Sequence, residues 1–129
     1  MALTKELVID YLLQLTTDAG RSLQWQEIQT GGFRTELNGV EIDLQPIPSR
    51  SGNCLYLFLR SDTLSTFIQE HRQPALFGAR AEGDDLTSNM RALHRAVAYQ
   101  CETRREVEER HRDEIRESVF RQLLFGPSL

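Results

Sequence analysis

A chain of 129 residues that is 40% apolar and 26% charged can form one hydrophobic core and has the composition of an ordinary globular protein. Its net charge of −4 at pH 7 gives no support to a basic surface of the kind that binds nucleic-acid phosphates. The start of the chain does not resemble a signal peptide, and no apolar run approaches the roughly 20 residues needed to cross a bilayer. The two cysteines lie outside any zinc or disulfide pattern, so we expect a reduced, cytoplasmic protein.

The first expected element is a helix that begins after Thr4 and ends near Gly20. Threonine is a favoured N-cap residue, and glycine suits the left-handed conformation that ends many helices. Apolar residues at three- and four-residue spacing predict one core-facing side of this helix. They are Leu3, Leu7, Val8, Tyr11, Leu12 and Leu15.

From residue 23 to residue 45 the apolar period changes to two, which is typical of strands with one buried and one solvated face. Asn38-Gly39 predicts a tight hairpin, because a type I′ turn needs positive φ at both central residues. We expect Pro46 and Pro48 to end the strand that follows this hairpin.

Segment 54–59 is almost entirely apolar and predicts an interior strand. Asp62 then predicts the N-cap of a short helix that ends near residue 71 and has Leu64, Phe67 and Ile68 on one face. Residues 74–83 are interpreted as a linker.

Residues 84–125 contain no proline or glycine and predict one long, heavily charged helix. At 1.5 Å per residue it would be about 63 Å long, more than a domain of this size can cover. The expected domain organisation is a compact domain at 1–73, the linker at 74–83 and the helix at 84–125. The predicted fold class is α+β, with an N-terminal helix, a three- to four-stranded antiparallel meander, a short helix and a long C-terminal helix.

Two apolar groups on the long helix are the predicted partner-binding residues. The first is a seam that is either coiled-coil-like or core-facing, formed by Leu86, Met90, Leu93 and Val97. The second follows a charged stretch and is formed by Ile115, Val119, Phe120, Leu123 and Leu124. Exposed apolar patches commonly mark interaction sites, which favours a docking role for the second group. The other interpretation is that the helix folds back and packs this group on its own sheet.

No arrangement of residues qualifies as a catalytic, cofactor-binding or metal site, and we expect no cofactor. Glu108-x-x-His111 has the spacing of a metal-binding pair, and Glu114 follows on the same helix. A single such pair on a helix crowded with acids is expected by chance. Cys54 and Cys101 have no base beside them in the sequence that would make either a nucleophile.

The N-terminal half resembles a small bacterial module of uncharacterised proteins, in which a helix precedes a Leu-x-Trp strand, an Asn-Gly-type hairpin and an apolar strand. The matching stretches here are 23–25, 33–44 around Asn38-Gly39, and 55–59, within residues 5–60. The resemblance implies no activity and no functional residue.

Together these features predict a non-enzymatic protein–protein interaction module, a bacterial adaptor or accessory protein that associates through its C-terminal helix. The expected partner is the chain itself, as a homo-oligomer and most simply a dimer, or a larger protein. Nucleic acid and membrane are not expected partners. One alternative is a chaperone or immunity-type protein that sequesters an effector. A second is a small metal-binding or enzymatic protein using Glu108, His111 and Glu114.

Overall fold

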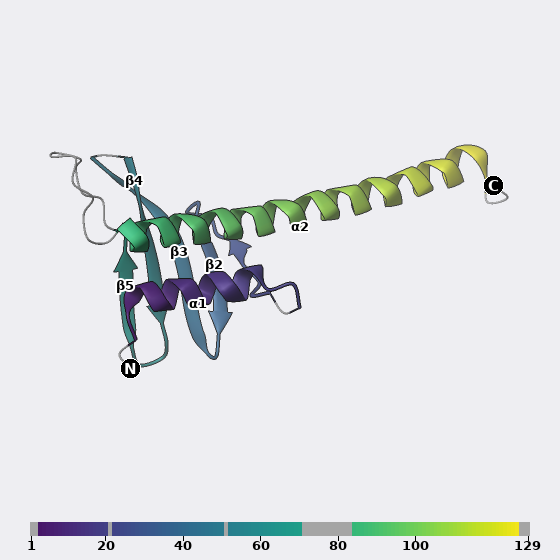
Figure 1. Ribbon diagram of the computed structural model, residues 1–129. Coiled ribbons are helices and arrows are strands. Elements are labelled where there is room, and N and C mark those ends of the chain that lie inside the picture. Colours follow the sequence, from purple (N-terminus) through teal and green to yellow (C-terminus); the bar gives the residue numbers. More distant parts are fainter. Residues whose placement is uncertain (1–2, 21, 51, 71–83, 127–129) are drawn as a thin grey trace.

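The computed structural model describes residues 3–20, 22–50, 52–70 and 84–126, and the expected linker at 74–83 lies outside them. The fold is α+β, as predicted, with an N-terminal helix, an antiparallel sheet and a long C-terminal helix (Figure 1). The elements are α1 (Lys5–Thr17), β1 (Gln26–Glu27), β2 (Phe33–Leu37), β3 (Val40–Ser49), β4 (Gly52–Arg60), β5 (Ser65–Gln69) and α2 (Asp84–Phe125).

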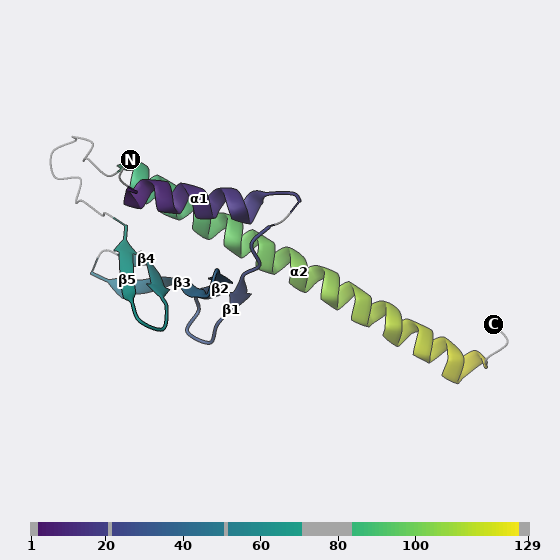
Figure 2. The ribbon, with the colours of Figure 1, turned by 90° about the horizontal axis from the view of Figure 1, so that it is seen from below.

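The sheet is a five-stranded meander in the order β1-β2-β3-β4-β5, and every strand runs antiparallel to its neighbours. It has more strands than the sequence predicted. Both helices lie on the same face of the sheet (Figure 2). No described element covers the other face, so the sheet has one face in the core and one toward solvent, as an antiparallel sheet can.

The N-terminal helix begins as expected, because the Thr4 side chain accepts a hydrogen bond from the backbone N–H of Leu7 at 3.2 Å. Its buried side differs from the predicted one. Ile9, Leu12 and Thr16 are buried. Leu3, Leu7 and Tyr11, which were expected to face the core, are exposed. Apolar residues surround most of this helix, so their spacing alone could not select the side that packs.

The Asn38-Gly39 hairpin is confirmed. Asn38 has φ of 53° and Gly39 has φ of 79°, as a type I′ turn requires, and Leu37 pairs with Val40 across the turn. Phe33 and Thr35 are buried, and Arg34 and Glu36 between them are exposed. The alternation predicted for this strand is therefore also confirmed.

The prediction that Pro46 and Pro48 end their strand is wrong, because β3 continues to Ser49. In the β3–β4 ladder these prolines lie opposite Leu55 and Asn53. Pairing of β3 with β2 stops at Leu44, so the prolines occupy a part of β3 that has no neighbour on its β2 side. A proline on such a free edge does not remove a ladder hydrogen bond.

The predicted short helix after Asp62 is also wrong. A tight turn, closed by a hydrogen bond from Ser61 N–H to the Leu64 carbonyl at 2.8 Å, returns the chain as β5. In β5 only Ile68 is buried. The run Ser-Thr-Phe-Ile is rich in residues that favour strands. Pairing with the adjacent strand β4 therefore outweighed the weak helical spacing of this segment.

The hydrophobic core lies between the sheet and the two helices. Trp25, Leu44 and Leu57 are fully buried there. The first turns of α2 belong to the same core, since Leu86, Met90, Leu93 and Val97 are at most 1% exposed. Of the two interpretations of this seam, the structure places the four side chains in a core-facing arrangement.

Candidate interaction site on the C-terminal helix

The last half of α2 leaves the domain. Cys101 is the last buried residue of the helix and Arg104 the last half-buried one, and residues 105–125 are all exposed. This projecting segment is about 32 Å long at 1.5 Å per residue. Figure 1 shows it extending past the sheet with no described element beside it. The alternative in which the helix folds back onto the sheet is not what the structure shows.

The end of the projecting segment carries a group of exposed apolar side chains, which we call the distal cluster. It comprises the predicted residues Ile115, Val119, Phe120, Leu123 and Leu124. Leu123 and Leu124 are 75% and 74% exposed, and Phe120 is 54% exposed. Phe125, which was not among the predicted binding residues, adjoins the cluster and is also exposed. Hydrophobic area of this kind remains in contact with water in a single chain.

The other predicted binding residues have a different location. Because Leu86, Met90, Leu93 and Val97 are enclosed by the chain's own sheet and α1, they present no surface to a partner in this conformation. The structure thus separates the two predicted groups along one helix. The seam holds α2 to the domain, and the distal cluster lies beyond it.

Trp25 anchors α2 at the point where the helix leaves the domain. Its backbone N–H donates to the Gln100 side chain at 2.8 Å, and the Gln100 amide donates to the Leu23 carbonyl at 2.7 Å. The Trp25 indole N–H donates to Thr16 Oγ1 at 3.0 Å. The Trp25 carbonyl accepts a hydrogen bond from Arg104. Segment 23–25 is therefore bonded to both helices.

Ion pairs hold α2 at two further places. At the edge strand, Arg105 pairs with Glu27. Near the start of the helix, Arg91 pairs with the fully buried carboxylate of Glu70 through contacts of 2.8 and 2.9 Å. Glu70 also accepts the backbone N–H of Leu55 at 2.9 Å. These contacts fix the direction in which the projecting segment leaves the sheet.

The residues considered for metal binding or catalysis are not assembled into a site. Glu108, His111 and Glu114 are exposed on the projecting segment. Among the described residues there is no group of three or more side chains placed to hold a metal ion. Burial, as the largest effect, raises the pKa of the Cys101 thiol, which therefore stays protonated and is a poor nucleophile.

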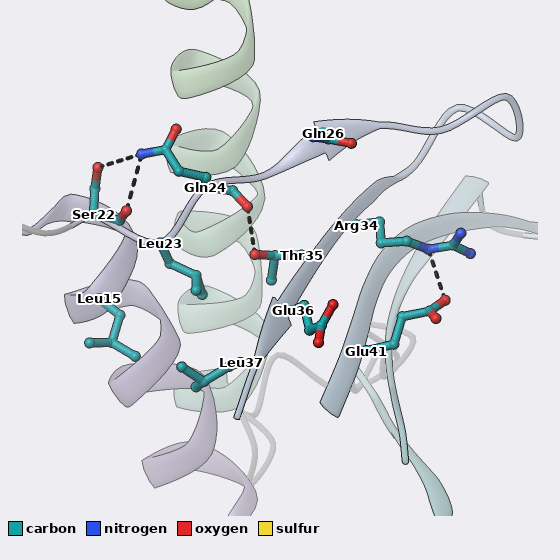
Figure 3. A pocket seen from close by; sticks show the side chains of 10 residues that line it. All are labelled: Leu15, Ser22, Leu23, Gln24, Gln26, Arg34, Thr35, Glu36, Leu37 and Glu41. Carbon is teal, nitrogen blue, oxygen red and sulfur yellow. Dashed lines mark hydrogen bonds and ion pairs between the residues drawn. The ribbon is translucent and has the colours of Figure 1, made fainter. Parts of the chain in front are cut away.

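A recess of about 590 Å3 lies beside the edge of β2 (Figure 3). Leu15, Leu23 and Leu37 form its apolar side, and Arg34 and Glu41, at the other side, are joined by an ion pair of 2.9 Å. The other residues that line the recess are polar or charged, and they include no pairing of a nucleophile with a base.

Comparison with known proteins adds no relationship: no family model, no curated protein and no solved structure matches the chain significantly. The resemblance noted for residues 5–60 gains no support from these comparisons. Within the described residues, no helix has the length and apolar character needed to cross a membrane.

Proposed function

We propose that the protein is a non-enzymatic interaction module that associates through the projecting segment of α2. The distal cluster is the contact surface, and the sheet with α1 and the first half of α2 is the scaffold that holds it. The partner is a second copy of the chain or a larger protein with an apolar groove. An adaptor or accessory role is consistent with this arrangement.

One observation carries the proposal: a helix that is firmly held over its first half ends in apolar side chains that no other described residue of the chain covers. Full burial of a leucine or phenylalanine side chain is worth about 1.5–3 kcal/mol. Several such side chains within three turns can therefore stabilise a complex substantially, even after the cost of association.

The shape of the segment also supports a helix-in-groove mode of binding, in which apolar residues three and four positions apart enter a hydrophobic groove. Ile115, Val119 and Leu123 follow one another at intervals of four. Phe120 and Leu124 form a second row beside them, so the cluster offers a broad contact.

The test replaces two exposed apolar side chains of the distal cluster with carboxylates. We expect Phe120→Asp combined with Leu124→Asp to abolish association through the distal cluster while leaving the circular dichroism and melting temperature of the domain unchanged, because both positions are exposed. Association is measured by light scattering over a concentration series and by comparing the proteins retained by wild-type and variant baits.

The matched control adds the same two charges to the same turns without removing apolar surface. Ser118→Asp combined with Gln122→Asp changes two exposed polar positions and should leave association intact. The proposal fails if the distal variant and the control behave alike, or if wild-type protein is monomeric at every concentration and retains nothing that the distal variant loses.

A further inference from the structure

Within the part of the chain that the structure describes, nothing protects the outer edge of β5 against pairing with another strand. β5 is the last strand of the sheet, and its sequence, Ser-Thr-Phe-Ile-Gln, contains no charge, proline or glycine. Natural edge strands are generally blocked by charged residues, proline, bulges or extreme shortness. The opposite edge of the sheet ends in the two-residue strand β1, so it follows that pattern and β5 does not.

The hydrogen bonds at the two ends of the β4–β5 ladder show which β5 groups point outward. Ser61 N–H bonds the Leu64 carbonyl, and Glu70 N–H bonds the Leu55 carbonyl at 3.0 Å. Both pairs continue the register of the ladder. In an antiparallel ladder, hydrogen-bonded pairs alternate with non-bonded pairs. The backbone N–H and C=O groups of Thr66 and Ile68 therefore point toward β4.

The backbone N–H and C=O groups of Ser65, Phe67 and Gln69 consequently point away from β4. No partner for them lies among the described residues. The three residues form a symmetric set with Phe67 at its centre. An antiparallel copy of β5 would pair Ser65 with Gln69, Phe67 with Phe67, and Gln69 with Ser65, and every outward group would then be bonded.

The side chains match the same register. Phe67 is 54% exposed on the open face of the sheet, and its ring centre lies 6.0 Å from that of Tyr56 and 6.2 Å from that of Phe58. With Phe67 opposite its own copy, these three rings and their equivalents would form one aromatic band across the junction. Aromatic pairs across adjacent strands stabilise a sheet.

From this self-complementary register we infer that two copies of the chain dimerise by antiparallel pairing of their β5 strands, with the two-fold axis at Phe67. A strand that satisfies all of its own outward groups against itself fits a second copy better than an unrelated peptide, which would have to supply the same apolar centre and polar flanks. The result is a continuous ten-stranded sheet with an isologous interface.

The dimer would separate the two distal clusters. The axis of such a pairing is perpendicular to the sheet, so all four helices lie on one side. α2 begins near β5 and leaves the domain beyond β1 (Figures 1 and 2). The two projecting segments therefore point away from the axis in opposite directions. This interface is distinct from the distal cluster, and it leaves both clusters free for other partners.

The test uses opposite charges at the axis. Phe67→Lys and Phe67→Glu each place like charges directly opposite each other, and each should raise the dimer dissociation constant at least about tenfold. An equimolar mixture of the two variants should regain dimer, because lysine then faces glutamate. Masses are measured by light scattering and sedimentation of the full chain, with circular dichroism to confirm folding.

Leu64→Lys is the matched control, since it adds a lysine at an exposed turn position outside the paired strand and should leave the dimer intact. A wild-type protein that stays monomeric at high concentration overturns the inference, as does a Phe67→Lys variant as dimeric as wild type. A mixture without dimer also overturns the Phe67-centred register. The Phe120→Asp, Leu124→Asp variant should remain dimeric, so the failure of this inference and the failure of the proposed function are distinguishable.

Discussion

At the scale of single residues, a few polar side chains join segments that are far apart in the sequence. Gln100 bonds two backbone groups of the connection between α1 and β1, and Thr16 bonds the indole of Trp25. Trp25 is fully buried, and the Gln100 side chain is the hydrogen-bond partner of its backbone N–H. These contacts position the point from which α2 leaves the domain.

We expect Gln100→Ala to lower the free energy of unfolding by about 1–3 kcal/mol, because it leaves a buried donor and a carbonyl without their partner. Chemical denaturation measures the change. Gln122→Ala, on the exposed part of the same helix, is the control and should fall within about 0.5 kcal/mol of wild type. Equal stability of the two variants would show that the Gln100 bonds do not contribute.

We expect His94 to make the stability of the fold depend on pH. It is half-buried with its ring 5.7 Å from that of Phe33, and burial followed by the charge of Arg91 lowers its pKa, while Glu70 opposes the shift. The folded-state pKa thus lies below the unfolded value of about 6.5. Stability from neutral His94 is therefore present above that pH and lost as the pH falls through the folded pKa.

We expect the melting temperature of wild type to drop more between about pH 7 and about pH 5 than that of His94→Gln, which has no such proton to bind. His111→Gln, at an exposed position on the projecting segment, should keep the wild-type pH dependence. Thermal melts at matched ionic strength provide the comparison. If the melting temperature of His94→Gln falls as much as that of wild type, His94 is not the group responsible for the pH dependence.

The residue-scale contacts were the least predictable from the sequence. The sequence predicted a strand residue at Trp25, but Trp25 lies just before β1, and its bonds to Thr16 and Gln100 join positions that are 9 and 75 residues away. Spacing within a segment carries no information about such partners. Thr16 gave no signal, because a threonine in an apolar helix has no periodicity of its own.

At the scale of elements, local signals were reliable where the backbone itself requires a residue type. Thr4 caps α1, Asn38-Gly39 forms the hairpin, and the absence of proline and glycine from 84–125 corresponds to one continuous helix. Prediction failed where a neighbouring strand decided the outcome. β5 formed where helical spacing was present, and β3 continued through Pro46 because that edge needs no donor.

Substitution of Gly39 tests whether the hairpin between β2 and β3 requires a residue with positive φ. Gly39→Ala should lower the free energy of unfolding by about 1–2 kcal/mol, because a residue with a Cβ is strained in the left-handed region. A Cβ at this position would meet no atom within 4 Å, so the cost is conformational. Gly20→Ala is the control: its φ is not in that region, its nearest contact would be an ordinary 3.6 Å, and its stability should be close to wild type.

If denaturant melts gave Gly39→Ala and Gly20→Ala the same stability, the positive φ at Gly39 would not be a requirement of the folded hairpin. A cost for Gly39→Ala with no change in the denaturant slope would show that the turn is strained while the rest of the fold keeps its exposed area.

At the scale of the whole molecule, α2 has two roles along one axis. Its first half completes the hydrophobic core, and residues 105–125 stand outside it. The sequence predicted a helix too long for the domain, and it predicted the distal cluster. It did not decide between a core-facing and a partner-facing seam at Leu86–Val97, because both kinds of packing use the same four-three-four spacing.

The measurement that tests this account most directly is hydrogen–deuterium exchange, by mass spectrometry, of peptides covering 86–101 and 115–125. In dilute protein we expect slow exchange in the peptide covering 86–101 and fast exchange in the peptide covering 115–125, since the projecting segment lacks tertiary contacts with the other described residues. When the chain associates through the distal cluster, the peptide covering 115–125 should become protected, and the Phe120→Asp, Leu124→Asp variant should not show this change. Equal protection of both peptides in the dilute chain, or exchange at 115–125 that is the same with and without the partner of the distal cluster, would contradict the account.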